Sequence, residues 1–181
     1  MLKIAGAKVF KNGEFDEDDI FIEDDIFIEG DRIVATGDET GEVIDAKGLL
    51  AIPGLVDVHS HGAVGHDFCD GTHESIDAIT RYEASRGVTA WCGTTMTFPE
   101  EKLAGIMECA AEHVDAPDAA ALVGINMEGP FISPEKVGAQ KPRLRAAVQC
   151  GNVLSLAECV GRQNQACRYC PRGARRARIR R

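Results

Sequence analysis

Hydrophobic and polar positions change their rhythm near residue 50. Upstream of that point, short apolar runs alternate with turn residues, and the runs are KIAGAKVF, IFIEDDIFIEGDRIVATG and EVIDAKGLL. Asn12-Gly13, Gly30-Asp31 and Gly41 interrupt the runs, as turn residues do between strands. The hexapeptide DDIFIE occurs twice in tandem, at 18–23 and 24–29, and a repeat of even length leaves the strand faces unchanged. Residues 2–50 therefore predict a small β-rich unit.

From Ala51 the pattern predicts strands and helices in alternation. Residues 51–61, AIPGLVDVHSH, are typical of a buried strand, and VTAWCGTTMT (88–97) and ALVGINMEGPF (121–131) predict two more strands. Repeated βα units indicate a parallel sheet, open or closed into a barrel, with its chemistry at the carboxyl ends of the strands. We therefore expect an α/β fold here.

A helix is predicted between each pair of these strands. Thr72 is the expected N-cap of the first helix, which carries Ile76, Ile79 and Tyr82 at helical spacing. Pro99 opens the second helix and is followed by two glutamates, which suit a helix N-terminus. The expected inward positions of the second helix are Leu103, Ile106, Met107 and Ala110.

Histidines are concentrated after the first of these strands. Four of the five lie between positions 59 and 73. His59 and His61 end the first strand two residues apart, which puts them on one face, and Glu128 ends the third strand. Imidazoles and a carboxylate are good ligands for Zn²⁺, although two such histidines can also cap a strand and bond to neighbouring loops. The other histidines, His66, His73 and His113, are expected to be solvated loop or helix residues.

Composition indicates an ordinary globular protein. Hydrophobic residues make up 44% of the 181 residues and charged residues 27%. The chain shows neither a charged leader before a long apolar stretch nor an apolar run near the ~20 residues of a membrane helix. Seven cysteines, an odd number, are expected to be reduced thiols. We expect a cytoplasmic location and no membrane partner.

The net charge of −9 conceals a division at Pro142. Residues 1–142 hold ten basic and 28 acidic side chains, whereas residues 143–181 hold ten arginines, no lysine and a single acid, Glu158. The second stretch also contains four of the seven cysteines and neither histidine nor aspartate. The two stretches therefore follow different compositional rules.

Three runs carry a family resemblance. AIPGLVDVHSHG, GVTAWCGTTMTF and, most narrowly, GINMEGPFISPEKVGAQKP resemble N-acetylglucosamine-6-phosphate deacetylase of the amidohydrolase superfamily. The resemblance covers residues 1–142 and implies a metal-dependent (β/α)₈ TIM barrel with a small β-sandwich. It makes residues 1–50 strands of the β-sandwich and residues 51–142 the first βα units of a barrel that is incomplete in this chain, because a whole barrel needs about 250 residues.

The resemblance also implies roles for individual residues. Glu128 matches the principal metal ligand, and His59 and His61 match the pair used by members with a second metal. Ala139 and Gln140 match a stretch that contacts the sugar, largely through its backbone. The implied cofactor is a divalent metal, with Zn²⁺ expected, as one or two ions. The implied partner is a small amino-sugar phosphate, and intact members of the family are expected to be homo-oligomers.

The implied reaction is hydrolysis of the acetamide of N-acetylglucosamine 6-phosphate to glucosamine 6-phosphate and acetate, in amino-sugar catabolism. The family's general acid/base aspartate and two more histidine ligands are expected beyond Pro142. Because residues 143–181 contain neither Asp nor His, we expect no catalytic residue in this chain and no activity from it alone. A codon choice exists for which the tail, read one base later, resembles the family's continuation, so we interpret it as frameshifted.

Two other functions remain open. Another amidohydrolase, such as a dihydroorotase-like cyclic amidase, shares the H-x-H pair but is expected to lack M-E-G-P-F-I-S-P. The second alternative is an inactive fragment or a binding module whose ten arginines form a basic nucleic-acid-binding arm. We favour the frameshift and expect no nucleic-acid partner, because a frameshift explains the arginines, the cysteines and the end of the resemblance together.

Overall fold

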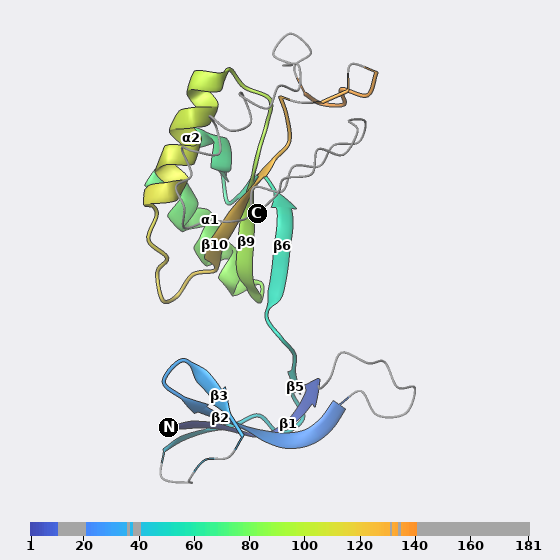
Figure 1. The fold of residues 1–181 in the computed structure, drawn as a ribbon. Coiled ribbons are helices and arrows are strands. Elements are labelled where there is room, and N and C mark those ends of the chain that lie inside the picture. Colours follow the sequence, from blue (N-terminus) through green and yellow to red (C-terminus); the bar gives the residue numbers. More distant parts are fainter. Residues whose placement is uncertain (11–20, 36, 38–40, 131, 134, 141–181) are drawn as a thin grey trace, which may run out of the picture. The chain divides into compact units, whose positions relative to one another are not determined.

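The structure is a computed structural model that describes residues 1–10, 21–35, 37, 41–130, 132–133, 135–140. The tail at 143–181, with its predicted frameshift, lies outside these residues, as does half of the first DDIFIE copy, residues 18–20. The chain divides into two units, of which the first is Met1–Pro53 and the second begins at Gly54 (Figure 1). Each unit is described by itself.

The first unit is a single five-stranded sheet. Its strands are β1 (Leu2–Phe10), β2 (Phe21–Glu29), β3 (Arg32–Val34), β4 (Glu42–Asp45) and β5 (Leu50–Ala51). They lie in the order β3-β2-β1-β4, with β5 also pairing with β1. β1 and β2 are antiparallel, whereas β4 and β5 run parallel to β1. The predicted β-rich character is confirmed, and the turn at Gly30-Asp31 joins β2 to β3 as expected.

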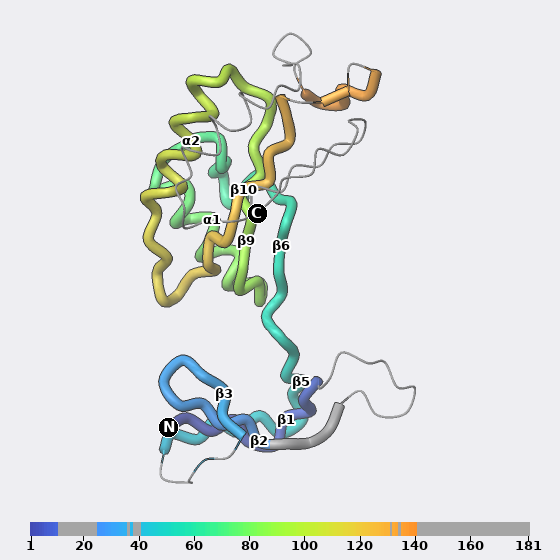
Figure 2. Tube along the Cα trace, in the orientation of Figure 1, coloured from blue at the N-terminus to red at the C-terminus, as the bar shows by residue number. Residues whose placement is uncertain are grey.

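The second unit contains three parallel strands with a helix in each connection. The strands β6 (Leu55–Ser60), β9 (Val88–Thr95) and β10 (Ala121–Met127) lie in the order β10-β9-β6, so β9 is central. The helices α1 (His73–Ser85) and α2 (Glu100–Glu112) cover the same face of this sheet (Figures 1 and 2). The predicted βα alternation is confirmed, and the described residues form an open sheet.

A short insertion separates β6 from α1. It consists of the hairpin β7 (Gly62–Ala63) and β8 (His66–Asp67), followed by the single 3₁₀ turn η1 (Phe68–Asp70). Phe68 is fully buried, and its ring occupies the place where a side chain at position 93 would begin. Glycine at position 93 therefore lets η1 pack directly on the centre of β9.

The helices form where caps and apolar spacing predicted them. The Thr72 hydroxyl accepts a hydrogen bond from the Ser75 amide at 3.2 Å and so caps the first turn of α1. Every predicted inward residue of α2 is buried, and so are Ile76 and Ile79 of α1. Tyr82 was expected on the same face, but it is only partly buried, and the Arg86 guanidinium lies 5.0 Å from its ring centre. The next residue, Glu83, is buried instead.

The core lies between the helices and β9. Phe68 and Trp91 meet edge to face at 5.6 Å between ring centres, and both are fully buried. The indole nitrogen of Trp91 donates to the Ser60 hydroxyl at 2.8 Å, which satisfies the polar atom of a buried ring. Leu103 and Met107 of α2 are also fully buried in this cluster.

The first strand of this sheet is not buried as its sequence predicted. The expected strand at 51–61 is divided between β5 and β6, and Leu55, Val56 and Val58 are 50%, 60% and 54% exposed. Among the described residues β6 pairs only with β9, so one edge of β6 has no neighbouring strand there. No helix in the described ranges is both long and apolar enough to cross a membrane.

Candidate metal centre

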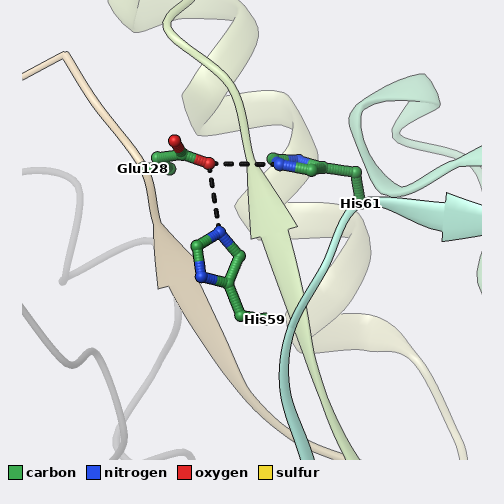
Figure 3. A group of neighbouring side chains, drawn as sticks. All are labelled: His59, His61 and Glu128. Carbon is green, nitrogen blue, oxygen red and sulfur yellow. Dashed lines mark hydrogen bonds and ion pairs between the residues drawn. The ribbon is translucent and has the colours of Figure 1, made fainter. Parts of the chain in front are cut away.

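Two outer strands of the three-stranded sheet bring three ligand-type side chains together. His59 is the fifth residue of the six-residue β6, His61 follows its end, and Glu128 follows the end of β10. Because β6, β9 and β10 are parallel, their carboxyl ends meet at one edge of the sheet. Figure 3 shows the two imidazoles pointing at the carboxylate from different sides.

The distances between these groups are those of a compact cluster. Nε2 of His59 lies 3.2 Å and Nε2 of His61 lies 3.1 Å from the same oxygen, Oε2 of Glu128. The three ligand atoms lie within 4.8 Å of one another, and the imidazole rings cross at 71°. Within the part of the chain that the structure describes, this is the one group of three or more such side chains with that spacing. A single small cation placed among the atoms would touch all three.

The hydrogen bond made by Nδ1 of His61 indicates how its other ring nitrogen faces Glu128. Nδ1 of His61 lies 3.2 Å from the carbonyl oxygen of Thr94, and a carbonyl can only accept, so Nδ1 carries the proton. In neutral His61, Nε2 then presents a lone pair to the Glu128 carboxylate, which is itself an acceptor. Two acceptors 3.1 Å apart repel each other unless a cation or a proton lies between them. The arrangement therefore suits a bound cation.

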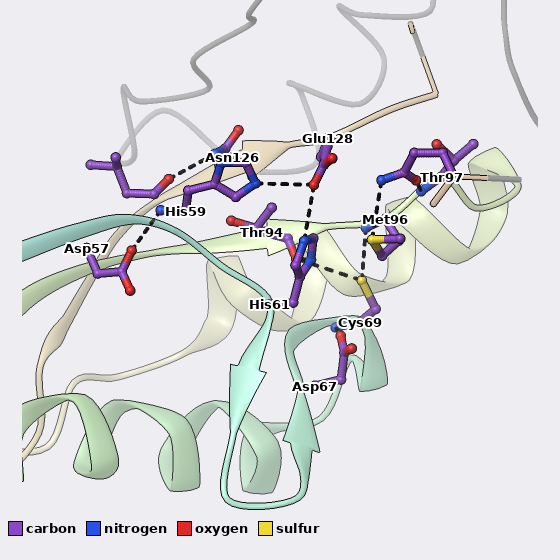
Figure 4. Close-up of polar contacts among 12 residues, drawn as sticks. Asp57, His59, His61, Asp67, Cys69, Thr94, Met96, Thr97, Asn126 and Glu128 are labelled. Atoms are coloured by element: carbon purple, nitrogen blue, oxygen red, sulfur yellow. Dashed lines mark hydrogen bonds and ion pairs between the residues drawn. The ribbon is translucent and has the colours of Figure 1, made fainter. Parts of the chain in front are cut away.

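Two polar side chains that the sequence analysis did not name support the strand ends. Oδ1 of Asp57 accepts from the His59 amide at 2.8 Å, and Nδ2 of Asn126 on β10 donates to the Val58 carbonyl on β6 at 2.9 Å (Figure 4). The Asn126 bond ties the outer strands together across β9. Asn126 precedes Glu128 by two positions in a strand, so the period of two was the signal that could have indicated it.

The cluster is open to solvent on one side. The side chain of His59 is 56% exposed, and those of His61 and Glu128 are 36% and 37% exposed. Three protein ligands around Zn²⁺ leave at least one position for water or a substrate oxygen, which distinguishes a catalytic zinc site from a structural one. The exposure is therefore compatible with an ion that small molecules can reach.

A buried thiol lies beside the cluster and does not join it. Sγ of Cys69 accepts from the Met96 amide at 3.3 Å and lies 4.0 Å from the Thr94 carbonyl (Figure 4). Burial raises the pKa of this thiol to about 11, and the nearby Asp67 carboxylate acts in the same direction while the Met96 amide opposes it. The thiol is therefore protonated at neutral pH, which suits neither a metal ligand nor a nucleophile.

The remaining histidines lie apart from the cluster. Nδ1 of His66 lies 3.1 Å from the Ser75 hydroxyl, and the His73 side chain is 55% exposed. The expectation that His113 is solvated was wrong, because its side chain is only 3% exposed. Its two ring nitrogens lie 3.8 Å from Asp77 and 3.5 Å from Asp115, so α1 and the loop after α2 enclose it.

The two residues expected to contact a sugar differ in their surroundings. Ala139 is exposed, whereas Gln140 is only 6% exposed. Oε1 of Gln140 accepts from the Thr97 amide at 2.6 Å, and its Nε2 donates to the Met96 sulfur at 3.3 Å. The Gln140 side chain is thus engaged just beyond the carboxyl end of β9, on the side of the sheet that carries the cluster.

Comparisons with known proteins agree with the motifs. The chain is 40% identical over 89 residues to an N-acetylglucosamine-6-phosphate deacetylase from Vibrio furnissii, a match that covers 49% of this chain and 22% of that protein. It is 26% identical over 165 residues to the deacetylase of the same name from Danio rerio, covering 88% of this chain and 40% of that protein. An N-acetylgalactosamine-6-phosphate deacetylase from Escherichia coli O157:H7 is 30% identical over 96 residues, covering 52% and 26%. No family model matches the chain.

The fold agrees as well. A solved structure of a mutant N-acetyl-D-glucosamine-6-phosphate deacetylase from Mycobacterium smegmatis, in complex with N-acetyl-D-glucosamine-6-phosphate, superposes with a TM-score of 0.71 at 24% identity. That superposition covers 88% of this chain and 40% of the mycobacterial chain. This chain thus spans between 22% and 40% of the length of the proteins compared here. The predicted resemblance to part of the N-acetylglucosamine-6-phosphate deacetylases is confirmed.

Proposed function

We propose that this chain carries part of the active site of a metal-dependent deacetylase that hydrolyses the acetamide of N-acetylglucosamine 6-phosphate to glucosamine 6-phosphate and acetate. The observation that carries the proposal is the convergence of His59, His61 and Glu128 at the carboxyl ends of parallel strands. The likeness to deacetylases of that name supports the choice of substrate.

The ligand set fits a divalent metal ion, and we propose Zn²⁺. Two imidazoles and one carboxylate form a ligand set that catalytic zinc sites use. Such an ion, when bound, polarises a carbonyl and lowers the pKa of a bound water. Glu128 and His61 would hold it, with the Thr94 carbonyl fixing the ring orientation of His61. His59 would complete the set or serve a second ion.

The residues of this chain would bind and orient the substrate. The ion held by the three ligands would set where the acetamide lies, and the backbone at Ala139 and Gln140 is proposed to contact the sugar. Hydrolysis also needs a group that takes a proton from water and delivers it to the leaving amine. We propose that an aspartate outside this chain's residues supplies it, as the family resemblance implies.

The proposed architecture follows from the same resemblance. Residues 51–142 would be the first βα units of an incomplete (β/α)₈ barrel, residues 1–50 would contribute strands to a β-sandwich, and residues 143–181 would be a frameshifted tail. The open edge of β6 suits a sheet whose neighbouring strand is absent from the described residues. We propose the cytoplasm as the compartment, since Cys69 and Cys109 are reduced thiols.

The sugar epimer is the one competing substrate that a specific observation favours. An N-acetylgalactosamine-6-phosphate deacetylase matches this chain over 96 residues. The two substrates share the acetamide and the phosphate and differ at a single hydroxyl of the sugar ring. Comparing their rates in one assay therefore separates the two proposals without any change to the metal site.

Zinc binding tests the site. The 181-residue chain, carried on a solubilising fusion partner, should bind Zn²⁺ with a Kd weaker than about 1 μM, because three protein ligands hold an ion less firmly than a complete set. Glu128→Gln should weaken binding by at least about 10-fold, whereas Glu135→Gln, which changes an exposed carboxylate, should not. Titration against a chromophoric chelator measures both. Equal affinities in the two variants would contradict the site.

Activity tests the reaction. The chain alone should release no acetate, and restoring the reading frame after Pro142 in the gene should give a longer protein that does. In that protein Glu128→Ala should abolish acetate release, and removing the 6-phosphate from the substrate should lower kcat/KM because that group helps position the acetamide. A restored frame that meets a stop within a few codons, or a product inert toward acetylated amino sugars, would overturn the proposal.

A further inference from the structure

Of the described residues between 132 and 140, Gln140 is the one that is buried. Glu135, Lys136, Gly138 and Ala139 are exposed, whereas Gln140 is 6% exposed. Both polar atoms of the Gln140 amide are used, one as acceptor from the Thr97 amide at 2.6 Å and one as donor to the Met96 sulfur at 3.3 Å. The partners lie more than 40 residues away in sequence, so these bonds connect two distant segments.

The backbone around Gln140 is also fixed by this attachment. The backbone N–H of Gln140 donates to the Val137 carbonyl at 3.2 Å, and the backbone N–H of Lys136 donates to the Ser133 carbonyl at 3.3 Å. Gly138, inside the turn that the Gln140–Val137 bond closes, has φ +61°, a left-handed conformation that suits glycine. One turn therefore ends at Lys136 and the next at Gln140, and the Gln140 side chain sets where the second turn lies.

The attachment point is close to the metal cluster along β9. Thr94, whose carbonyl accepts from His61, precedes Met96 by two residues, and the Met96 amide is held by the Cys69 sulfur. Thr97 is also in contact with the residue that follows Glu128, because a side chain at Gly129 would overlap the Thr97 hydroxyl. The end of β9 thus contacts both the segment that carries Glu128 and the segment that ends at Gln140.

We propose that Gln140 is a positioning residue, whose side chain fastens the turns at 135–140 to the end of β9. Its side-chain amide is engaged in this attachment and the residue is only 6% exposed, so the backbone at Ala139 and Gln140, and not the Gln140 side chain, is left for the sugar contact of the proposed function. This inference rests on the proposed function for its ligand. The attachment itself does not depend on that function.

Two substitutions separate the parts of this role. Gln140→Met keeps the length of the side chain and leaves the Thr97 amide without its acceptor. Gln140→Glu keeps an oxygen for Thr97, loses the donor to Met96 and adds a carboxylate at a buried position. Glu135→Gln is the matched control, since it makes the reverse exchange at an exposed position of the same segment.

The experiment uses the full chain on its solubilising partner and has two readouts. Native-state tryptic cleavage after Lys136, followed by mass spectrometry, should accelerate about 10-fold in Gln140→Met and less in Gln140→Glu. With Zn²⁺ present, calorimetry should show about 10-fold weaker binding of N-acetylglucosamine 6-phosphate to Gln140→Met, partial rescue in Gln140→Glu, and Zn²⁺ affinity unchanged in both. A residue that only stabilises the fold would lower both affinities together.

The possible outcomes test the attachment, the positioning role and the proposed function separately. If cleavage after Lys136 is equally fast in Gln140→Met and wild type, the Gln140 side chain does not fasten the segment at 135–140 to the end of β9. That result holds for any function of the protein. If Zn²⁺ and sugar-phosphate affinities fall by the same factor, the positioning role is wrong. If cleavage accelerates but the zinc-loaded wild type fails to bind the sugar phosphate, the attachment is supported and the proposed function fails.

Discussion

Strands β6 and β9 have similarly apolar sequences and opposite surroundings. In β9, Trp91 is fully buried and Val88 is 9% exposed, because β9 has a neighbour on each side and a covering of helices. In β6, Val56 and Val58 are 60% and 54% exposed. The difference shows that apolar sequence sets a tendency toward burial, whereas the neighbours of a strand decide whether the burial occurs.

The prediction with the largest expected effect compares the removal of apolar atoms from the core that covers β9 with their removal from β6. Leu103→Ala should lower the free energy of unfolding by about 3 kcal/mol, because it opens a cavity under α2 in the core that covers β9. Val58→Ala removes atoms already in water and should cost less than about 0.5 kcal/mol. Urea unfolding followed by the fluorescence of Trp91, the single tryptophan, measures both. Similar losses in the two variants would mean that β6 is covered in solution.

A second test concerns Glu83 of α1, the one acidic residue that is buried among those the structure describes. Burial, and to a lesser extent the negative Asp57, raises the pKa of Glu83, so ionised Glu83 destabilises the fold at neutral pH. Glu83→Gln should therefore gain about 1 kcal/mol at pH 7. Because the folded pKa lies above the unfolded one, the gain should shrink as pH falls through the folded pKa and vanish below about pH 4.

The control for Glu83 is Glu108→Gln on the exposed side of α2. It removes the same charge from a solvated position, so its effect at pH 7 should stay within about 0.5 kcal/mol. Urea unfolding at pH 7 and pH 4 provides the comparison. A gain that persists at pH 4, or an equal gain in the control, would assign the effect to net charge and not to burial.

The smallest expected effect on stability is at the edge of β6. Val56→Lys adds a charge to an exposed position on a strand edge and should change the free energy of unfolding by less than about 0.5 kcal/mol. It should nevertheless reduce aggregation of the chain, because a charged edge disfavours pairing between molecules. Light scattering at constant concentration tests this. Val114→Lys, at an 83% exposed position outside the sheet, should have little effect.

The sequence predicts the helices because they depend on local rules, and it predicts the strand-end cluster because the βα alternation implies a parallel sheet. The cap at Thr72 and the apolar spacing of α2 are visible in a single stretch of chain. The meeting of His61 and Glu128 was predictable because parallel strands end at one edge. The exposure of β6 was not predictable from its own residues, since it depends on which strands lie beside it.

Other differences arise from single contacts that leave no mark on a sequence pattern. Tyr82 and Glu83 are adjacent on α1, and helical spacing alone did not show that the glutamate is the more deeply buried of the two. His113 is enclosed by carboxylates from α1 and from the next loop, a tertiary arrangement. The Thr94 carbonyl that orients His61 is backbone and carries no residue signature.

The central place of β9 has a consequence for the order of folding. His59 and Glu128 are 69 residues apart, and the strand that separates them in the sheet lies between them in sequence. Both βα units must therefore form before His59 and Glu128 can meet. The entropy cost of closing the chain between these two residues must be overcome before a bound ion can stabilise the fold. A metal ion at this site would bind late and stabilise the finished sheet by mass action. It would not nucleate folding, so added metal should slow unfolding more than it speeds folding.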